Sequence, residues 1–204
     1  MDGPALPPLL DLAGTAVFAL SGALIAARLN QTFVTCAFFA LLTGVGGGSV
    51  RDVLLGQPAF WLRDLWVAPV VLSTAFIAWF LPGKWWEGRW LEWADALGMA
   101  AFSTLGVAKA LAFDVAPLPA VILGVVTGCV GGIIRDVIAG VPSILMRPEL
   151  YVTASALAAS LCAGLMLTGV QDYAAMAIAA TAGFLLRGAA MVWRIELPAY
   201  SRKG

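Results

Sequence analysis

Histidine is absent from the 204-residue sequence. Imidazole is a frequent acid–base group and metal ligand, so its absence excludes histidine-based triads and histidine-containing metal sites. Charge is also scarce, because only 12% of residues are Asp, Glu, Lys or Arg, against about 25% in a typical soluble domain. With 61% hydrophobic residues, the composition predicts a membrane protein, and we expect no enzymatic activity.

The few charges balance, with 12 basic and 12 acidic residues and zero net charge. This balance argues against a nucleic-acid partner. The three cysteines, Cys36, Cys129 and Cys162, stand singly in apolar runs, so we expect small core residues and no disulfide framework. No metal and no cofactor is expected.

Apolar runs of about 20 residues can cross a bilayer as helices. Seven such runs predict an all-α membrane protein with one transmembrane domain over residues 1–204. The expected spans are 11–29, 32–54, 66–82, 94–113, 117–138, 150–168 and 172–193. The tryptophan-rich segment 82–90 is predicted to be an interfacial loop.

Glycines, prolines and charges recur at a constant offset of 84 residues without a gap. The segment 44–52 is followed by Gly56 and Pro58, and its repeat 128–136 by Gly140 and Pro142. Identical pairs include Asp11/Asp95, Gly14/Gly98, Phe18/Phe102, Gly22/Gly106, Thr43/Thr127, Gly47/Gly131, Gly48/Gly132, Arg51/Arg135, Asp52/Asp136 and Arg63/Arg147. We therefore predict repeat one over 11–83, repeat two over 95–167 and a separate seventh helix over 172–193. Three spans per repeat place the two repeats in inverted orientations in the membrane.

Clustered glycines lie in the second and fifth spans, although glycine is about 1 kcal/mol less favourable than alanine within a helix. These glycines are Gly46, Gly47, Gly48, Gly131 and Gly132. Close helix packing is one explanation. We favour a break or kink that directs backbone carbonyls to a cation near the midplane.

An Arg-Asp dipeptide follows the glycines in each repeat. Neighbouring side chains on a helix do not face each other, so each charge needs another partner. We expect each arginine to pair with the aspartate that begins the first span of its repeat, which leaves the second aspartate for the ion path or the other repeat. The expected pairs are Asp11 with Arg51 and Asp95 with Arg135, and the remaining aspartates are Asp52 and Asp136. Snorkelling to the interface is the alternative.

Lys109 lies inside the fourth span. A charge that crosses the full membrane field gains about 2.3 kcal/mol per 100 mV, so this lysine is a candidate for biasing gating, with snorkelling as the alternative. Four hydroxyl residues are candidate polar wall groups of the path, although a bond to their own helix backbone is the simpler expectation for each. They are Ser21, Ser49, Ser103 and Thr104.

Basic residues predict the orientation. The side that holds the N-terminus receives Arg51 and Arg63 from its loops, whereas most other basic residues lie on the opposite side. We expect the N-terminus outside, the C-terminus in the cytoplasm, and a multi-pass protein in the cell's inner membrane.

The two glycine-Arg-Asp copies in a pattern of three plus three plus one spans resemble the trimeric intracellular cation (TRIC) channel family, in its prokaryotic branch. The resemblance covers about residues 11–194, and the second copy departs from the first at Val130, where repeat one has Gly46. It implies a homotrimer in which each subunit has its own pore, lined by the kinked second and fifth helices. The implied permeant ions are K+ and, less selectively, Na+.

A monovalent cation channel is therefore the expected function. The alternative is a secondary transporter for a small solute such as glycine, because inverted repeats with broken helices are also typical of transporters. A packing or assembly protein without a path is a third possibility, and the paired charges within the membrane argue against it.

Overall fold

The computed structural model describes residues 8–80, 82–83 and 89–198. Within them the chain forms seven α-helices of 14 or more residues and two short 3-10 helices. In order they are α1 (Pro8–Arg28), α2 (Phe33–Leu54), η1 (Phe60–Leu62), α3 (Val67–Phe80), α5 (Trp90–Ala112), α6 (Pro117–Ala139), η2 (Ile144–Met146), α7 (Val152–Leu167) and α8 (Asp172–Trp193).

The helices follow the expected spans closely, and the start of α5 differs most. This helix begins at Trp90 and not near residue 94, and an ion pair of 2.8 Å between Arg89 and Glu92 spans its first turn. Most of the expected interfacial loop, residues 84–88, lies outside the described residues.

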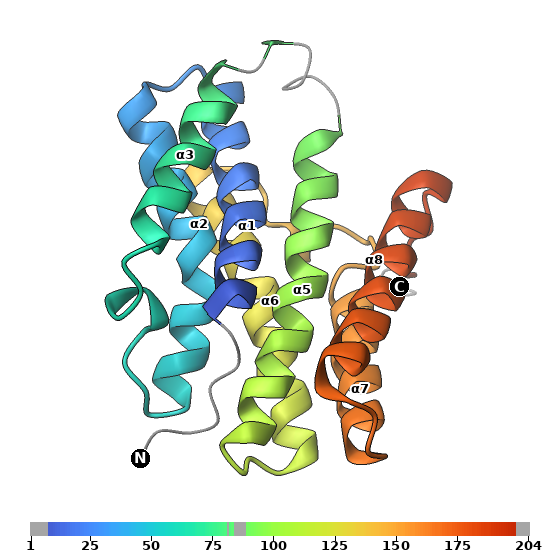
Figure 1. Ribbon diagram of the computed structural model, residues 1–204. Helices are drawn as coiled ribbons and strands as arrows, with labels where there is room; N and C mark the ends of the chain where they lie inside the picture. Colours follow the sequence, from blue (N-terminus) through green and yellow to red (C-terminus); the bar gives the residue numbers. More distant parts are fainter. Residues whose placement is uncertain (1–7, 81, 84–88, 199–204) are drawn as a thin grey trace, which may run out of the picture.

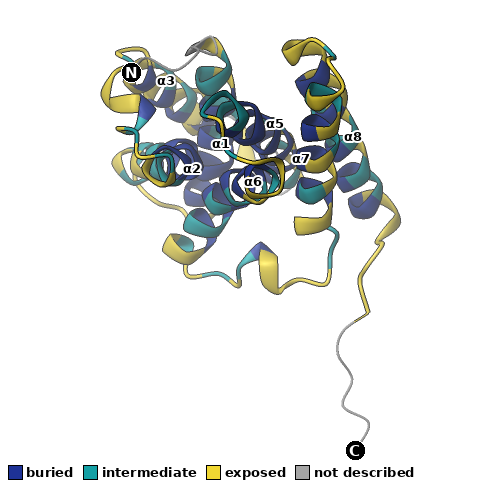
Figure 2. Ribbon diagram, turned by 90° about the horizontal axis from the view of Figure 1, so that it is seen from below, coloured by how far each residue is buried: buried dark blue, intermediate teal, exposed yellow. Residues whose placement is uncertain are grey.

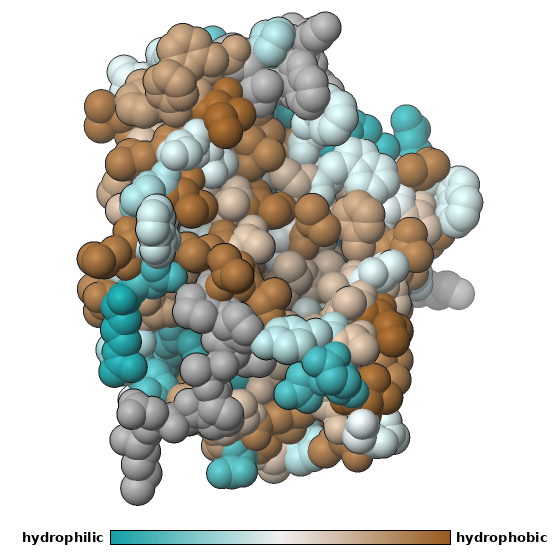
Figure 3. All heavy atoms as spheres, in the orientation of Figure 1, coloured by the Kyte–Doolittle hydropathy of each residue, from teal (hydrophilic) through white to brown (hydrophobic). Residues whose placement is uncertain are grey.

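Four helices, α1, α2, α6 and α8, are long and apolar enough to cross a membrane. The helix α5 is 23 residues long but carries Glu92, Asp95 and Lys109. The helices α3 and α7 are apolar but shorter, at 14 and 16 residues. Large apolar side chains remain exposed on the outer faces, and hydrophobic residues cover much of the face in Figure 3. Such a surface suits contact with lipid.

The two repeats pack as inverted copies (Figure 1). In repeat one α1 packs against α2 and α3, and in repeat two α5 packs against α6 and α7. The repeats meet where α2 contacts α6 and α1 contacts α5. The helix α8 stands outside the repeat and packs on α5 and α7. Seen along the helices, the buried faces of α1, α2, α5 and α6 lie at the centre, with α3 and α8 on opposite sides (Figure 2).

Reciprocal contacts mark the centre of this pseudo-symmetry. Phe18 and Phe102, which are equivalent in the two repeats, stack with ring centroids 5.4 Å apart. A Cβ added to Gly14 would lie 2.8 Å from Phe102, and one added to Gly98 would lie 2.9 Å from Phe18. The pseudo-two-fold axis therefore passes between the two rings.

The helices α2 and α6 end in the same way. Gly56 lies two residues beyond the end of α2 and Gly140 one residue beyond the end of α6. Both have φ of 66°, a left-handed conformation that glycine adopts without a steric penalty. The next amide in each chain segment donates back to the carbonyl of Asp52 or Asp136. These two turns place η1 and η2 at equivalent positions beside the ends of the helices.

Candidate functional site

The glycine-rich stretches lie where α2 crosses α6. Both helices are continuous through these glycines, so the expected break with released carbonyls is wrong. A Cβ on Gly47 would lie 2.2 Å from the carbonyl oxygen of Thr127, and a Cβ on Gly131 would lie 2.9 Å from that of Thr43. The helices touch backbone to backbone here, and close packing explains why these positions lack side chains.

The departure at Val130 has a simple explanation in this packing. Its equivalent, Gly46, faces mainly the flexible end of Ile134, whose Cδ1 would lie 2.6 Å from an added Cβ, whereas the nearest backbone atom, the Cα of Gly131, would lie 4.0 Å away. A side chain is therefore more easily accommodated at this position than at Gly47 or Gly131, where the neighbour is backbone.

Cluster one, formed by Asp11, Arg51, Asp52 and Lys109, lies at one end of this crossing. Arg51 donates from Nη1 to Asp11 Oδ1 over 2.9 Å and from Nε to Asp52 Oδ1 over 2.8 Å. The ammonium of Lys109 reaches in from α5 of the other repeat, donates to Asp52 Oδ1 over 2.9 Å, and lies 4.0 Å from Asp11 Oδ2. Two carboxylates thus meet two cations, and Arg51 and Asp52 are fully buried.

Cluster two, formed by Asp95, Arg135 and Asp136, lies at the equivalent place in repeat two. Arg135 donates from Nη1 to Asp95 Oδ1 over 2.5 Å. It also donates from Nε and Nη2 to Asp136 Oδ1, over 2.9 and 2.8 Å. Ser21 lies 3.3 Å from Arg135 Nη1. Both of the arginine–aspartate pairs expected from the sequence, Asp11–Arg51 and Asp95–Arg135, are present.

The second aspartates meet our expectation in part, because Asp52 faces the other repeat through its bond to Lys109. Asp52 and Asp136 are buried, and each bonds to its own neighbouring arginine, so the expectation that neighbours do not pair was wrong. The long arginine side chain folds back along the helix to reach the adjacent carboxylate. The other oxygen accepts a backbone amide from the 3-10 helix, Phe60 N over 2.8 Å or Ile144 N over 2.7 Å. These amide donors were missed, because a sequence shows a turn but not which amide points inward.

The four hydroxyl residues all bond to their own helix backbone. Each donates to a carbonyl three or four residues earlier. Three have a second partner: Ser21 lies near Arg135, Ser49 accepts from Trp61 Nε1 over 3.0 Å, and Ser103 bonds to Ser155 over 2.7 Å. Among them, Ser21 is the one in contact with a charge cluster, and a pore role for all four stays a prediction.

The helix α8 contributes a buried charge whose partner the sequence did not reveal. Arg187, 1% exposed, pairs with Glu149 over 2.6 Å and lies over the ring of Tyr151, 5.4 Å from its centroid. Glu149 and Tyr151 belong to the loop that also contains Ile144, the amide donor to Asp136. The seventh helix therefore anchors the loop beside cluster two.

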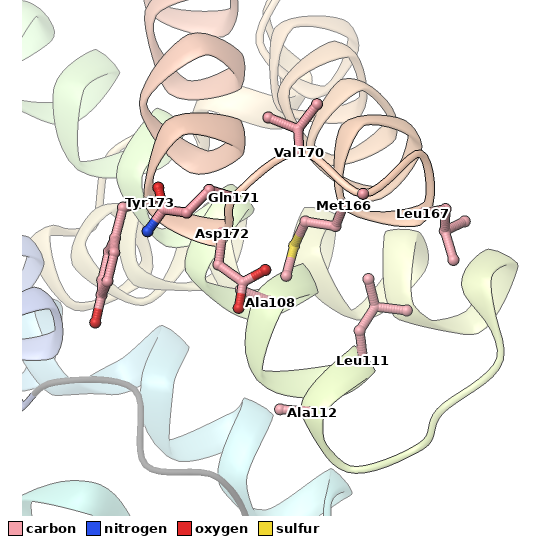
Figure 4. Close-up of a pocket in the computed structure, with 10 residues that line it drawn as sticks. Ala108, Leu111, Ala112, Met166, Leu167, Val170, Gln171, Asp172 and Tyr173 are labelled. Carbon is pink, nitrogen blue, oxygen red and sulfur yellow. The ribbon is translucent and has the colours of Figure 1, made fainter.

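Elsewhere, a hollow of about 680 Å³ lies between the end of α5 and the connection from α7 to α8 (Figure 4). It is lined mainly by apolar groups, and its charged residue is Asp172. Within the described residues no group of three or more Cys, Asp and Glu side chains is arranged to hold a metal ion. The two charge clusters are therefore the candidate site.

Comparisons with known proteins agree with this arrangement. A family model described as "Glycine transporter" matches residues 8–82 and 92–167, which are the two repeats. The UPF0126 membrane protein of Vibrio cholerae is 37% identical, over 95% of this chain and 82% of its own length. The UPF0126 inner membrane protein YadS of Escherichia coli is 36% identical, over 94% of this chain and 95% of its own length.

Solved structures show the same fold. The TRIC trimeric intracellular cation channel orthologue from Rhodobacter sphaeroides superposes with a TM-score of 0.84 at 34% identity, over 92% of this chain and 97% of that one. A prokaryotic TRIC channel crystallised in 0.5 M KCl also gives a TM-score of 0.84, at 24% identity, over 93% of this chain and 97% of the other. With the family match over both repeats and the inverted seven-helix fold, the chain is a multi-pass membrane protein that belongs to the prokaryotic branch of the TRIC channel family.

Proposed function

We propose that the chain is a channel for monovalent cations, K+ among them, with one ion path in each subunit. The path follows the crossing of α2 and α6 from cluster one to cluster two. The observation that carries this proposal is the pair of buried, pseudo-symmetric charge clusters at the two ends of that crossing. Charges inside a membrane protein are expensive to maintain and commonly mark a path for ions.

The direct backbone contact at Gly47 and Gly131 leaves no room for an ion between these glycines. In this proposal the structure is therefore a closed state, and conduction needs a small separation of α2 from α6. Continuous helices retain their own carbonyl bonds, so the ion's partners are the carboxylates of the clusters and water. Lys109 is the charge placed to respond to voltage, because its ammonium lies on the path at cluster one.

We further propose a homotrimer in the inner membrane, with the N-terminus outside and the C-terminus in the cytoplasm. Trimer assembly is supported by the trimeric Rhodobacter sphaeroides relative, and inner-membrane location by the Escherichia coli relative. Light scattering of the purified protein tests the trimer, and cysteine accessibility in cells tests the orientation.

Purified protein in planar bilayers with a K+ gradient tests the channel. Unitary currents that reverse near the K+ equilibrium potential are expected. The variants Asp52→Asn and Asp136→Asn should lower the conductance or the preference for K+ over Cl−, whereas Asp64→Asn, in a loop, should leave both unchanged. Wild-type conductance and selectivity in both cluster variants would contradict the proposed path.

A secondary transporter for a small solute such as glycine is the second candidate. It is favoured by the family description and by the inverted repeats, which transporters often have. Saturable glycine uptake into liposomes, with no unitary current in the bilayer experiment, would support the transporter over the channel.

A further inference from the structure

We propose that cluster two binds one monovalent cation at the place where cluster one holds the ammonium of Lys109. This inference extends the proposed channel function by giving its path a specific ion site. The pseudo-symmetry of the two repeats supports it, together with one residue at which that symmetry fails.

The symmetry of the clusters is close. In both, an arginine joins two aspartates, and the second aspartate accepts a backbone amide from a 3-10 helix. Each arginine uses Nη1 for the first aspartate and Nε for the second. An ion or group bound at one cluster therefore has a defined equivalent position at the other.

The fourth member breaks the symmetry. Lys109 completes cluster one, and the residue equivalent to it in repeat one is Ile25, at the offset of 84. Ile25 is 7% exposed and lines a cavity beside Asp95 and Asp136. The shorter, uncharged side chain of Ile25 thus supplies no cation where cluster one has an ammonium. The buried part of cluster two has two carboxylates and one guanidinium, which leaves one negative charge.

The charge around Asp95 points to the missing cation. Asp95 is 1% exposed, its Oδ1 accepts from Arg135, and its other polar neighbour is the neutral hydroxyl of Tyr151, so no cation among the described residues bonds to its Oδ2. In cluster one the equivalent atom, Asp11 Oδ2, lies 4.0 Å from the ammonium. Two buried carboxylates with a single balancing cation are costly, and a bound cation supplies the compensation that the ammonium of Lys109 supplies in cluster one.

The cavity has the size for such an ion. Its volume is about 140 Å³, and one water occupies about 30 Å³ in the liquid, so an ion with a few waters fits. The other charged residues along it are Arg28, Glu92 and Arg147; both arginines are exposed, and Glu92 is partly buried. One excess negative charge in the buried part selects a monovalent ion, because a divalent ion would leave an excess positive charge.

Thallous ion, a heavy substitute for K+, tests the site directly. In crystals of the full chain soaked in Tl+, anomalous scattering should show a peak between Asp95 and Asp136 in the wild type. The peak should be absent from Ile25→Lys, whose new ammonium occupies the site, and present in the matched control Ile25→Leu. A wild-type map without a peak at cluster two, at saturating Tl+, would overturn the inference.

Thermal unfolding of the purified protein gives a second measure that does not need crystals. The midpoint should rise saturably when N-methyl-D-glucamine chloride is replaced by KCl at constant ionic strength. Ile25→Lys and Asp95→Asn should lose this response, and Lys109→Ile should enlarge it by creating a second site. A proton on Asp95 would be the competing occupant, and a carboxylic-acid infrared band that disappears in Asp95→Asn would contradict cation binding.

These results separate the site from the channel. A Tl+ peak without unitary currents would retain the site and reject conduction. Currents with an empty cluster two would retain the channel and reject this inference.

Discussion

Cluster one and cluster two occupy equivalent places in the two repeats, but they are completed in different ways. In cluster one, Lys109 reaches across from repeat two and balances the carboxylates. In cluster two, the uncharged Ile25 stands at the equivalent position, and the second neighbour of Asp95 is the neutral hydroxyl of Tyr151. The inverted repeat thus supplies one binding geometry twice, and a single residue determines whether a side chain or a mobile ion completes it.

The loops beside the two clusters are also held differently. The loop beside cluster two is anchored by Arg187 of α8 through Glu149. The residue of repeat one equivalent to Glu149 is Leu65, which is 90% exposed. The helix α8 therefore supports the loop beside cluster two and not its equivalent beside cluster one. We expect the loop beside cluster one to be the more mobile of the two.

The largest difference between the clusters should appear when the central arginine is removed. Arg135→Met leaves two buried carboxylates without a cation, and breaking a buried pair in this way costs about 3–5 kcal/mol. Arg51→Met should be milder, because Lys109 still faces Asp52 and Asp11. Thermal unfolding of the detergent-purified variants measures both changes.

Arg63→Met, at an exposed position, is the control for the loss of an arginine. Equal destabilisation by Arg135→Met and Arg51→Met would show that Lys109 does not compensate within cluster one. The difference between the two clusters would then have no consequence for stability.

A smaller effect is expected at the crossing of α2 and α6. Gly47→Ala places a methyl group against the carbonyl of Thr127 and should destabilise by about 1–3 kcal/mol, the usual range for overpacking. Gly46→Ala, one residue earlier, meets mainly the flexible end of Ile134 and should be nearly neutral. Thermal unfolding again measures the change.

The helical Gly164, which has no neighbour within 4 Å of an added Cβ, provides the control. Gly164→Ala should be neutral or slightly stabilising, since alanine is the better helix former. If Gly46→Ala destabilised the protein as strongly as Gly47→Ala, the absence of a close backbone contact at this position could not explain why repeat two has Val130 there.

Much of this architecture could be predicted from the sequence. Hydrophobic runs gave the seven spans, and the constant offset gave the inverted repeats, because both depend on patterns that extend over many residues. The pairs Asp11–Arg51 and Asp95–Arg135 could also be predicted, since the span count places each aspartate and arginine on the same side of the membrane.

The remaining features depend on contacts that no linear pattern contains. Glycine is equally compatible with a broken helix and a close crossing, and only the neighbouring carbonyl of Thr127 distinguishes them. The bond between Arg51 and Asp52 depends on the conformation of the arginine side chain. The contact between Lys109 and Asp52 depends on the angle at which α5 passes α2. The offset shows which residues are equivalent, but not which neighbours they meet.

The smallest expected effect concerns a polar contact that occurs in repeat two alone. Ser103 and Ser155 share a buried hydrogen bond of 2.7 Å, whereas the equivalent residues of repeat one, Ala19 and Val71, are buried and apolar. Hydrogen bonds between membrane helices contribute about 0.6 kcal/mol on average in double-mutant cycles. A cycle of Ser103→Ala and Ser155→Ala, measured by unfolding, should therefore give a coupling of about this size. Repeat one packs the same position without a hydrogen bond. A coupling of several kcal/mol would therefore mean that repeat two depends for its stability on polar contacts that repeat one does not need.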